Sequence, residues 1–364
     1  MNFMGQQELE IISSFELAEG MTIPCTIYYK SNNQLNTALR NSSLTKLTLI
    51  KLQKLEMTYG NLYVDAENLD LIKNIIDVFN RNKSLAEFYK SFNQIQNKAD
   101  TIIQSCFANS KVDTEEADEL SFSIKNTVVT VNASQIIQAI NNTSDINKYL
   151  YNHSVHVAFL NGLMGKWLGL SEKEIEELVY VGFVHDIGKT KIPKEVLDKP
   201  GKLTDEEFEV IKMHPIHSFN ILVQSGIKDP NILMSVRAHH EKTNGTGYPD
   251  GLPYEKIPYY ARITTISDIY DAMVSERVYK SIHSPFEVLD EFSRGRFSNL
   301  DTHLINVFLS NMPLELVGKS VVLSDGRIGT VMYVNQNNYA YPLVKVGEEF
   351  ITTNENLHCV SICE

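Results

Sequence analysis

Histidines gather in one part of the chain. Seven of its ten histidines lie within residues 153–240. Any one of them alone is more easily explained as a surface or core residue, but so many together favour a metal centre, because imidazole is a common ligand of transition metals. The seven are His153, His156, His185, His214, His217, His239 and His240. We therefore expect metal-assisted chemistry in this region.

Two pairs of adjacent residues strengthen this prediction. His185 and Asp186 follow the apolar run LVYVGFV and precede Gly188, a residue type that often ends a helix. A carboxylate at the end of a buried helical face is costly unless it is paired, and a metal ion would offset that cost. His239 and His240 would point about 100° apart in a helix, so both can serve one ion only near a helix end.

Two further carboxylates lie one helical turn apart. Asp268 and Asp271 share a face of the run ARITTISDIYDAMVS. An exposed acidic face is the alternative interpretation. Ile263, Ile266 and Ile269 place both carboxylates close to the core, which favours a functional role for them.

Successive amphipathic helices must position these residues. The runs KEIEELVYVGFVHD, TDEEFEVIKMHPIHSFNILVQ and PNILMSVRAHHE carry apolar stripes typical of helices around a shared core. Earlier in the chain, the runs TIPCTIYY and NLYVD predict strands on either side of a capped helix that ends at Gly60. We predict an α+β regulatory or docking module at 1–66, a helical connector at 67–139, a helical domain with the site at 140–314 and a small β appendage at 315–364.

Composition and charge restrict the possible partners. The net charge of −12 disfavours nucleic-acid polymers, which are bound mainly through Lys and Arg, although a metal cluster could still hold a small anion. The sequence contains no run near the roughly 20 apolar residues that span a membrane. It also begins without a basic segment followed by an apolar one, so we expect a cytoplasmic protein without a membrane partner. Its four scattered cysteines predict reduced thiols.

Five motifs of this sequence resemble those of the HD-GYP phosphodiesterases, a branch of the HD superfamily of metal-dependent phosphohydrolases. The motifs that carry the resemblance are HSVHVA from His153, HDIGK at 185–189, KPGKLTDEEFEVIKMHP at 199–215, HHEKTNGTGYPDGL at 239–252 and IPYYARITTISDIYDAMVSERVYK at 257–280. They span about half of the chain in the family's order and spacing. The resemblance implies an all-helical catalytic domain, so the predicted fold class is mainly α, with the small α+β module before it and the β appendage after it.

The resemblance also implies a binuclear ligand set. One ion would be held by His153, His185, Asp186 and Asp268, and the other by Asp186, His214, His239 and His240, with Asp186 as the bridge. Such donors suit iron, manganese or zinc, and the family often uses iron or manganese, in divalent or mixed-valence form. Some members hold a third metal with an acid four positions before the first histidine. Here that position is Tyr149, so we expect two ions unless Asp145 or another acid reaches the site.

Several residues match family positions that contact the substrate or take part in the reaction. Asp186 and Lys189 would be catalytic, with the Lys189 ammonium balancing charge on the phosphoryl oxygens. A lysine at a helix end that interacts with the helix dipole is the alternative for Lys189. The expected substrate contacts are Lys189, Tyr248, Asp271, Arg277 and Lys280. Asn244 occupies a loop position where the family commonly has Asp.

The resemblance implies hydrolysis of cyclic di-GMP to pGpG by a metal-activated hydroxide, and it leaves a further step to GMP open. Cyclic GMP-AMP or another nucleotide is an alternative substrate. A non-catalytic module that binds a cyclic dinucleotide and signals to a partner is an alternative of a different class. The complete ligand set argues against that module, and the loop around Tyr248 argues against a general nucleotidase. Docking and homodimer formation are both open as roles for the N-terminal module.

Overall fold

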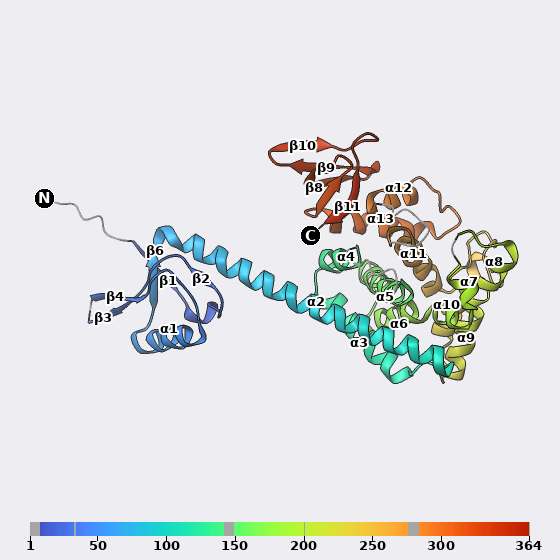
Figure 1. Cartoon of the computed structure of the whole chain (residues 1–364), viewed down its shortest axis with the longest axis horizontal. Coiled ribbons are helices and arrows are strands. Elements are labelled where there is room, and N and C mark those ends of the chain that lie inside the picture. The colour runs from blue at the N-terminus through green and yellow to red at the C-terminus, as the bar shows by residue number, and fades with distance from the viewer. Residues whose placement is uncertain (1–7, 33, 142–148, 200, 276–283, 364) are drawn as a thin grey trace. The chain divides into compact units, whose positions relative to one another are not determined.

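The chain forms two compact units. The computed structural model describes residues 8–32, 34–141, 149–199, 201–275 and 284–363 (Figure 1). One unit is Met1–Lys90 and the other is Ser91–Glu364, and helix α2 (Leu69–Asn109) contributes residues to both. The predicted mainly helical fold class is confirmed. Within the described ranges, none of the helices has the length and apolar character needed to span a membrane.

The first unit is built on an antiparallel sheet of order β1-β6-β3-β4. Its elements are β1 (Leu9–Ile12), η1 (Ser14–Glu16), β2 (Thr22–Ile23), β3 (Ile27–Ser31), β4 (Gln34–Leu39), β5 (Ser42–Ser43), α1 (Lys46–Tyr59), β6 (Leu62–Asp65) and η2 (Ala66–Asn68). The Thr45 hydroxyl caps α1 by accepting from the Thr48 N–H, and Gly60 ends this helix at φ 96°. Ile27, Leu52 and Leu62 are fully buried between the sheet and α1. The predicted helix and its flanking strands are therefore present.

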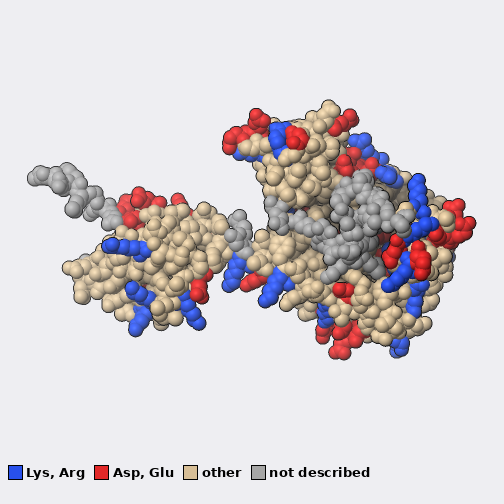
Figure 2. All heavy atoms as spheres, in the orientation of Figure 1, with Lys and Arg blue, Asp and Glu red and all other residues tan. Residues whose placement is uncertain are grey.

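The second unit is centred on helix α5 (Tyr149–Trp167), which packs against α3, α6 and α11. Residues 152–165 of α5 are buried on every side, as expected for a central helix. The other helices are α3 (Thr114–Thr130), α4 (Ala133–Asn141), α6 (Glu172–Val184), η4 (Ile187–Lys191), α7 (Lys194–Leu197), α8 (Asp205–Ile211), α9 (His214–Gln224), α10 (Pro230–Ala238), η5 (Tyr254–Lys256), α11 (Tyr259–Val274), α12 (Pro285–Ser293) and α13 (Thr302–Leu316). On the face shown in Figure 2, basic and acidic side chains are interspersed over this unit.

Aromatic side chains fill the core between α5, α11, α12 and α13. The Phe308 ring lies 5.2 Å from that of Tyr270 and 5.6 Å from that of Phe292. Trp167, the last residue of α5, meets the same Phe308 ring edge to face at 6.3 Å. These contacts join the end of the central helix to the C-terminal helices.

Five antiparallel strands end the chain, in the order β10-β9-β8-β7-β11. They are β7 (Ser320–Leu323), β8 (Ile328–Asn335), β9 (Asn338–Val346), β10 (Glu349–Thr352) and β11 (Cys359–Cys363). Strand β9 packs against α12. A sheet therefore forms where the sequence predicted a small β appendage.

Candidate metal centre

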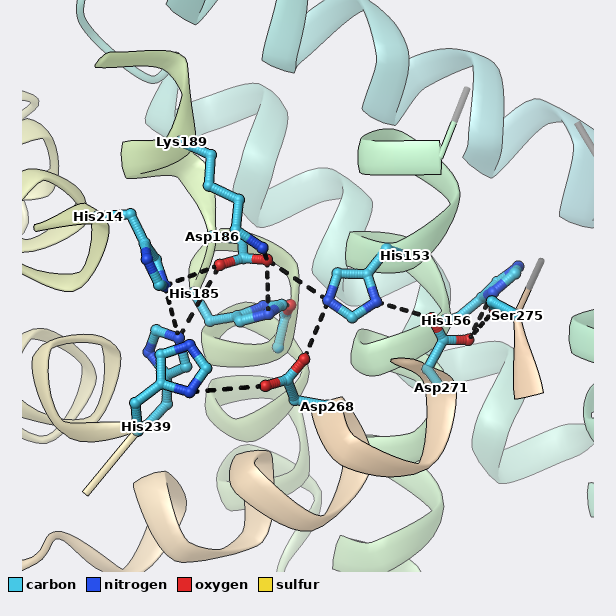
Figure 3. A network of polar contacts seen from close by, with 12 residues as sticks. His153, His156, His185, Asp186, Lys189, His214, His239, Asp268, Asp271 and Ser275 are labelled. Carbon is cyan, nitrogen blue, oxygen red and sulfur yellow. Dashed lines mark hydrogen bonds and ion pairs between the residues drawn. The ribbon is translucent and has the colours of Figure 1, made fainter. Parts of the chain in front are cut away.

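Histidines and carboxylates in or next to six helices of the second unit meet at one place (Figure 3). His153 lies on α5 and Asp268 on α11, whereas the other five residues lie at or next to helix ends. His185 ends α6, Asp186 begins η4, His214 begins α9, and His239 and His240 follow α10. The structure thus brings together all seven residues predicted as ligands.

The junction of η4 and α9 holds Asp186 beside His214. A Cβ atom at Gly188 would overlap the His214 carbonyl oxygen and the Ser218 backbone nitrogen, so glycine is required there. The Ser218 hydroxyl accepts from the Gly188 N–H and donates to the His185 carbonyl, both at 2.8 Å. These contacts fix the chain on both sides of Asp186.

The two oxygens of Asp186 face different groups of side chains. Its Oδ1 lies 3.1 Å from His214 Nε2 and 3.9 Å from His239 Nε2. Its Oδ2 lies 3.4 Å from His153 Nε2 and 3.3 Å from His185 Nε2. Asp186 therefore stands between two sets of imidazoles, as a bridging carboxylate must.

The donor atoms form two clusters of metal-binding size. One contains Asp186, His214, His239 and His240, and the other contains His153, His185 and Asp268; within each cluster the donor atoms lie within 4.8 Å of one another. Asp268 also connects the two, because its Oδ1 is 3.1 Å from His153 Nε2 and its Oδ2 is 3.9 Å from His240 Nδ1.

Main-chain carbonyls orient three of the imidazoles. Nδ1 of His185, His214 and His239 lies 2.7 Å from the carbonyl oxygen three residues earlier in each case. A nitrogen that donates its proton to a carbonyl leaves the opposite ring nitrogen with a free lone pair. The Nε2 atoms of these residues consequently face the cluster in the form that binds metals.

Burial and charge favour the metal-binding protonation states. Burial lowers the pKa of His239 far below 6.5, and the neighbouring histidines lower it further, so that this imidazole stays neutral. Burial raises the pKa of Asp186 and Asp268, but the charges and hydrogen bonds around them outweigh burial and hold both values well below 3.8. For Asp186 the opposing groups are Lys189, His185 and His153.

Two buried polar atoms of the clusters provide a further test of fit. Among the described residues, His185 Nε2 and Asp186 Oδ1 have no hydrogen-bond partner. Buried polar atoms in this state are destabilising, and a cation held by each cluster would remove the penalty. The residues present therefore fit divalent metal ions.

Residues 136–304 match the family model of the HD domain. This region is an HD domain. The match confirms the predicted HD superfamily for this region, and an HD domain implies binding of divalent metal.

Curated relatives are similar to part of this chain. A cyclic di-GMP phosphodiesterase from Pseudomonas aeruginosa is 34% identical over 204 residues, which cover 56% of this chain and 49% of that protein. The 3'3'-cGAMP-specific phosphodiesterase 1 of Vibrio cholerae is 34% identical over 169 residues, which cover 45% of this chain and 38% of that protein. This chain thus spans half or less of the length of these relatives.

A solved structure shares the fold. It is that of Bd1817, described as an HDG"Y"P protein from Bdellovibrio bacteriovorus, with a TM-score of 0.50 and 18% sequence identity. The match covers 82% of this chain and 98% of the other. At 18% sequence identity, this likeness indicates a shared fold and nothing about activity.

Lys189 and Tyr248 lie next to the clusters of the HD domain. The Lys189 ammonium forms an ion pair with Asp186 Oδ2. The half-buried Tyr248 ring stacks on His240, with ring centroids 4.7 Å apart and planes 29° apart. Both predicted contact residues are therefore in place beside the donor atoms.

Glu241 organises the loop that carries Tyr248, a role that sequence reasoning missed. Its carboxylate is 2% exposed and accepts from the N–H groups of Asp250, Gly251 and Leu252 at 2.7, 3.0 and 3.0 Å. A Cβ at Gly247 would overlap the backbone of residues 240–242, so the loop folds tightly onto this helix end. An acidic residue directly after His240 in a glycine-rich segment was the available signal.

Asn244 keeps the local role expected of an Asp in the same loop. Its Oδ1 accepts from both the backbone N–H and the hydroxyl of Thr246. The departure from the family pattern leaves this turn contact intact.

The structure corrects the predicted role of Asp271. Its side chain is completely buried and lies on the side of His153 away from the clusters (Figure 3). Its Oδ2 is 2.7 Å from His153 Nδ1, and its Oδ1 is 2.8 Å from His156 Nδ1. Asp271 is therefore not placed to contact a substrate, because α11 turns only Asp268 toward the clusters.

The remaining predicted positions lie outside the described residues. Arg277 and Lys280 fall within 276–283, and Asp145 falls within 142–148. The side chain of Tyr149 is likewise not described. The expected substrate contacts of Arg277 and Lys280 and the expected absence of a third metal stay predictions.

Proposed function

We propose that this chain is a metal-dependent phosphodiesterase that hydrolyses cyclic di-GMP to pGpG. The observation that carries the proposal is the position of Asp186, whose two oxygens face two separate sets of imidazole nitrogens. The name of the Pseudomonas aeruginosa relative supports the substrate. A further cleavage to GMP would use the same residues.

The proposed ligands are those of the two clusters. We assign one ion to His153, His185, Asp186 and Asp268, and the other to Asp186, His214, His239 and His240. Mixed imidazole and carboxylate donors make iron or manganese the proposed metals. Two such ions, when bound, supply Lewis acidity that polarises the phosphodiester and lowers the pKa of the attacking water.

The residues around the clusters have separate tasks in this proposal. Lys189 places an ammonium beside Asp186, where it can stabilise negative charge that develops on the phosphoryl oxygens. Tyr248 offers a flat wall next to His240, and burial raises the pKa of its hydroxyl, which therefore stays neutral. Glu241 holds that wall in place through three N–H groups of the loop.

Cyclic GMP-AMP is the second candidate substrate. The Vibrio cholerae relative named for 3'3'-cGAMP is as identical to this chain as the Pseudomonas aeruginosa relative is, although over a shorter region. The two substrates differ in one base, so a direct comparison of their hydrolysis rates distinguishes them.

Metal content and turnover test the proposal together. Protein purified without air would be subjected to elemental analysis and then assayed chromatographically with cyclic di-GMP and cyclic GMP-AMP. We expect about two ions per chain and linear product from the wild type, as a two-metal site requires, with both lost in Asp186→Ala. Asp325→Ala is the matched control, because it removes an exposed carboxylate from the turn between β7 and β8.

Each outcome has a distinct meaning. Metal without turnover of either cyclic dinucleotide would reject the proposed substrate class while keeping the metal centre. Absence of metal after reconstitution with iron or manganese would reject the centre itself.

A further inference from the structure

His153 obtains its orientation differently from three other histidines of the centre. His185, His214 and His239 lie at helix ends and donate from Nδ1 to main-chain carbonyls. His153 lies inside α5, and its Nδ1 is 2.7 Å from the carboxylate of Asp271. A side chain on another helix therefore does for His153 what the main chain does for the others.

An ionised carboxylate can only accept hydrogen bonds, so it determines which nitrogen of His153 carries the proton. With the proton on Nδ1, the lone pair is on Nε2. That atom lies 3.4 Å from Asp186 Oδ2 and 3.1 Å from Asp268 Oδ1. Asp271 thus holds His153 in the tautomer that a metal ligand needs.

His156 and Ser275 hold Asp271 in turn. The second oxygen of this carboxylate lies 2.8 Å from His156 Nδ1 and accepts from the Ser275 hydroxyl at 3.0 Å. His156 is 1% exposed, and its ring lies 6.4 Å from that of Phe92 on α2. With both oxygens engaged in a buried position, the carboxylate cannot turn away from His153.

We propose that Asp271 and His156 are positioning residues of the metal centre: Asp271 fixes the tautomer and ring plane of His153, and His156 fixes Asp271. Through His153, this pair sets the affinity for the ion of the His153, His185 and Asp268 cluster. The inference rests on the metal binding in the proposed function, but it does not depend on the identity of the substrate. It replaces the substrate contact that the sequence predicted for Asp271.

Asp271→Asn tests the first part of the proposal. The amide offers one accepting and one donating group, so it cannot accept from His153 and His156 together, and one imidazole must change tautomer. We expect a loss of about 10- to 100-fold in the affinity for one of two Mn²⁺ ions, as found when residues that orient a ligand are changed. Affinity for the second Mn²⁺ ion should stay within about threefold of the wild-type value. Titration of the metal-free protein with Mn²⁺ in the absence of nucleotide measures both.

A matched pair of variants tests His156. Asn places an N–H group close to the position of His156 Nδ1, whereas Leu has similar bulk without a donor. We expect His156→Leu to weaken binding of the same Mn²⁺ ion and His156→Asn to restore most of the affinity. Equal behaviour of the two variants would show that His156 only fills space, and it would overturn this part of the proposal.

Kinetics separate positioning from substrate contact. If Asp271 acts through His153, excess Mn²⁺ restores kcat in Asp271→Asn, and KM for cyclic di-GMP stays within about twofold, since only metal occupancy has changed. A raised KM with unchanged Mn²⁺ affinity would overturn the inference and return Asp271 to a substrate role. A wild type that binds no Mn²⁺ would instead reject the proposed function and the inference with it.

Asp301→Asn controls for general loss of stability. Asp301 is another carboxylate of this unit, 6% exposed and 2.6 Å from Arg262 Nη1. Its substitution should lower the resistance to urea without changing Mn²⁺ affinity. If Asp271→Asn fails to fold, the variants His156→Leu and His156→Asn still test whether this network controls the affinity for Mn²⁺.

Discussion

At the scale of single residues, the metal centre contains three kinds of side chain. These are the proposed metal ligands, the cationic Lys189 next to them, and side chains that orient the ligands. Asp186 cannot be replaced by a neighbour, because each of its oxygens faces a different cluster. Lys189 contacts Asp186 but is not itself a donor to a cation, since a protonated amine has no free lone pair. Substitutions of Asp186 and Lys189 should therefore have different effects on metal content.

Lys189→Ala should reduce kcat by about 10²- to 10³-fold, the usual effect of removing a group that stabilises charge in the transition state. Metal content should remain as in the wild type, because the ligands are unchanged. Steady-state kinetics combined with elemental analysis measures both. Lys191→Ala is the matched control: this lysine belongs to the same short helix, but its ammonium contacts Ser110. Loss of metal in Lys189→Ala would contradict the assignment.

At the scale of elements, the centre depends on how helix ends are joined. The hydroxyl of Ser218 bridges η4 and α9 through one accepted and one donated hydrogen bond. The carboxylate of Glu241 accepts three backbone N–H groups of the loop after α10 and so helps to hold this loop to the helix end. Each junction can be weakened without removing a ligand.

Ser218→Ala should lower the free energy of unfolding by about 1–3 kcal/mol, because it leaves the buried Gly188 N–H without its acceptor. Urea unfolding of the metal-free protein measures this change. Ser293→Ala removes an exposed hydroxyl that donates to the Asp290 carbonyl, and it should change stability by no more than about 0.5 kcal/mol. Equal effects of the two substitutions would contradict a special role for the η4–α9 junction.

Glu241→Gln should raise KM for the cyclic dinucleotide more than it lowers kcat. The amide NH₂ cannot accept the N–H groups that the carboxylate accepts, so the loop with Tyr248 loses part of its anchorage. Metal content should be unaffected, because Glu241 does not face the clusters. Steady-state kinetics of Glu241→Gln test this prediction, with Glu255→Gln, a substitution of an exposed glutamate, as the control. A fall in kcat at unchanged KM would contradict the proposed role of Glu241.

Some of this organisation could be predicted from the sequence, and some could not. The pairs His185–Asp186 and His239–His240 were predicted near helix ends, because helix termini depend on local sequence. Which of Asp268 and Asp271 faces the clusters depends on how α11 is rotated against α5, which spacing alone does not contain. Strand β1 was not predicted, since it is defined by pairing with distant residues, such as Leu9 with Asp65. The three hydrogen bonds of Glu241 could not be predicted either, because they form only when the loop folds back onto the helix end.

At the scale of the whole molecule, the buried imidazoles link stability to pH. His239 has a folded-state pKa far below its ordinary value of 6.5, mainly because of burial. Below pH 6.5 the unfolded chain therefore binds a proton that the folded chain does not, and unfolding becomes easier. Asp186 and Asp268 act at lower pH, because their folded-state pKa values lie below 3.8 and their stabilising contribution is lost as pH falls through those values.

The metal-free protein should consequently lose stability between pH 7.5 and 5.5, by up to about 1.4 kcal/mol per pH unit from His239. Urea unfolding in the presence of a chelator at several pH values measures the slope. His239→Gln should flatten it, whereas substitution of the exposed His303 should leave it unchanged. A slope that is the same in all three proteins would show that His239 does not govern acid stability.

Trp167 is the single tryptophan of the chain, and this half-buried side chain at the end of the central helix α5 contacts Phe308. Its fluorescence emission therefore reports on the environment of the second unit alone. Far-ultraviolet circular dichroism also registers α1 and the sheet of the first unit. Coincident melting curves from the two signals would mean that both units unfold in one cooperative step, and separated curves would assign the tryptophan transition to the unit that holds the metal centre.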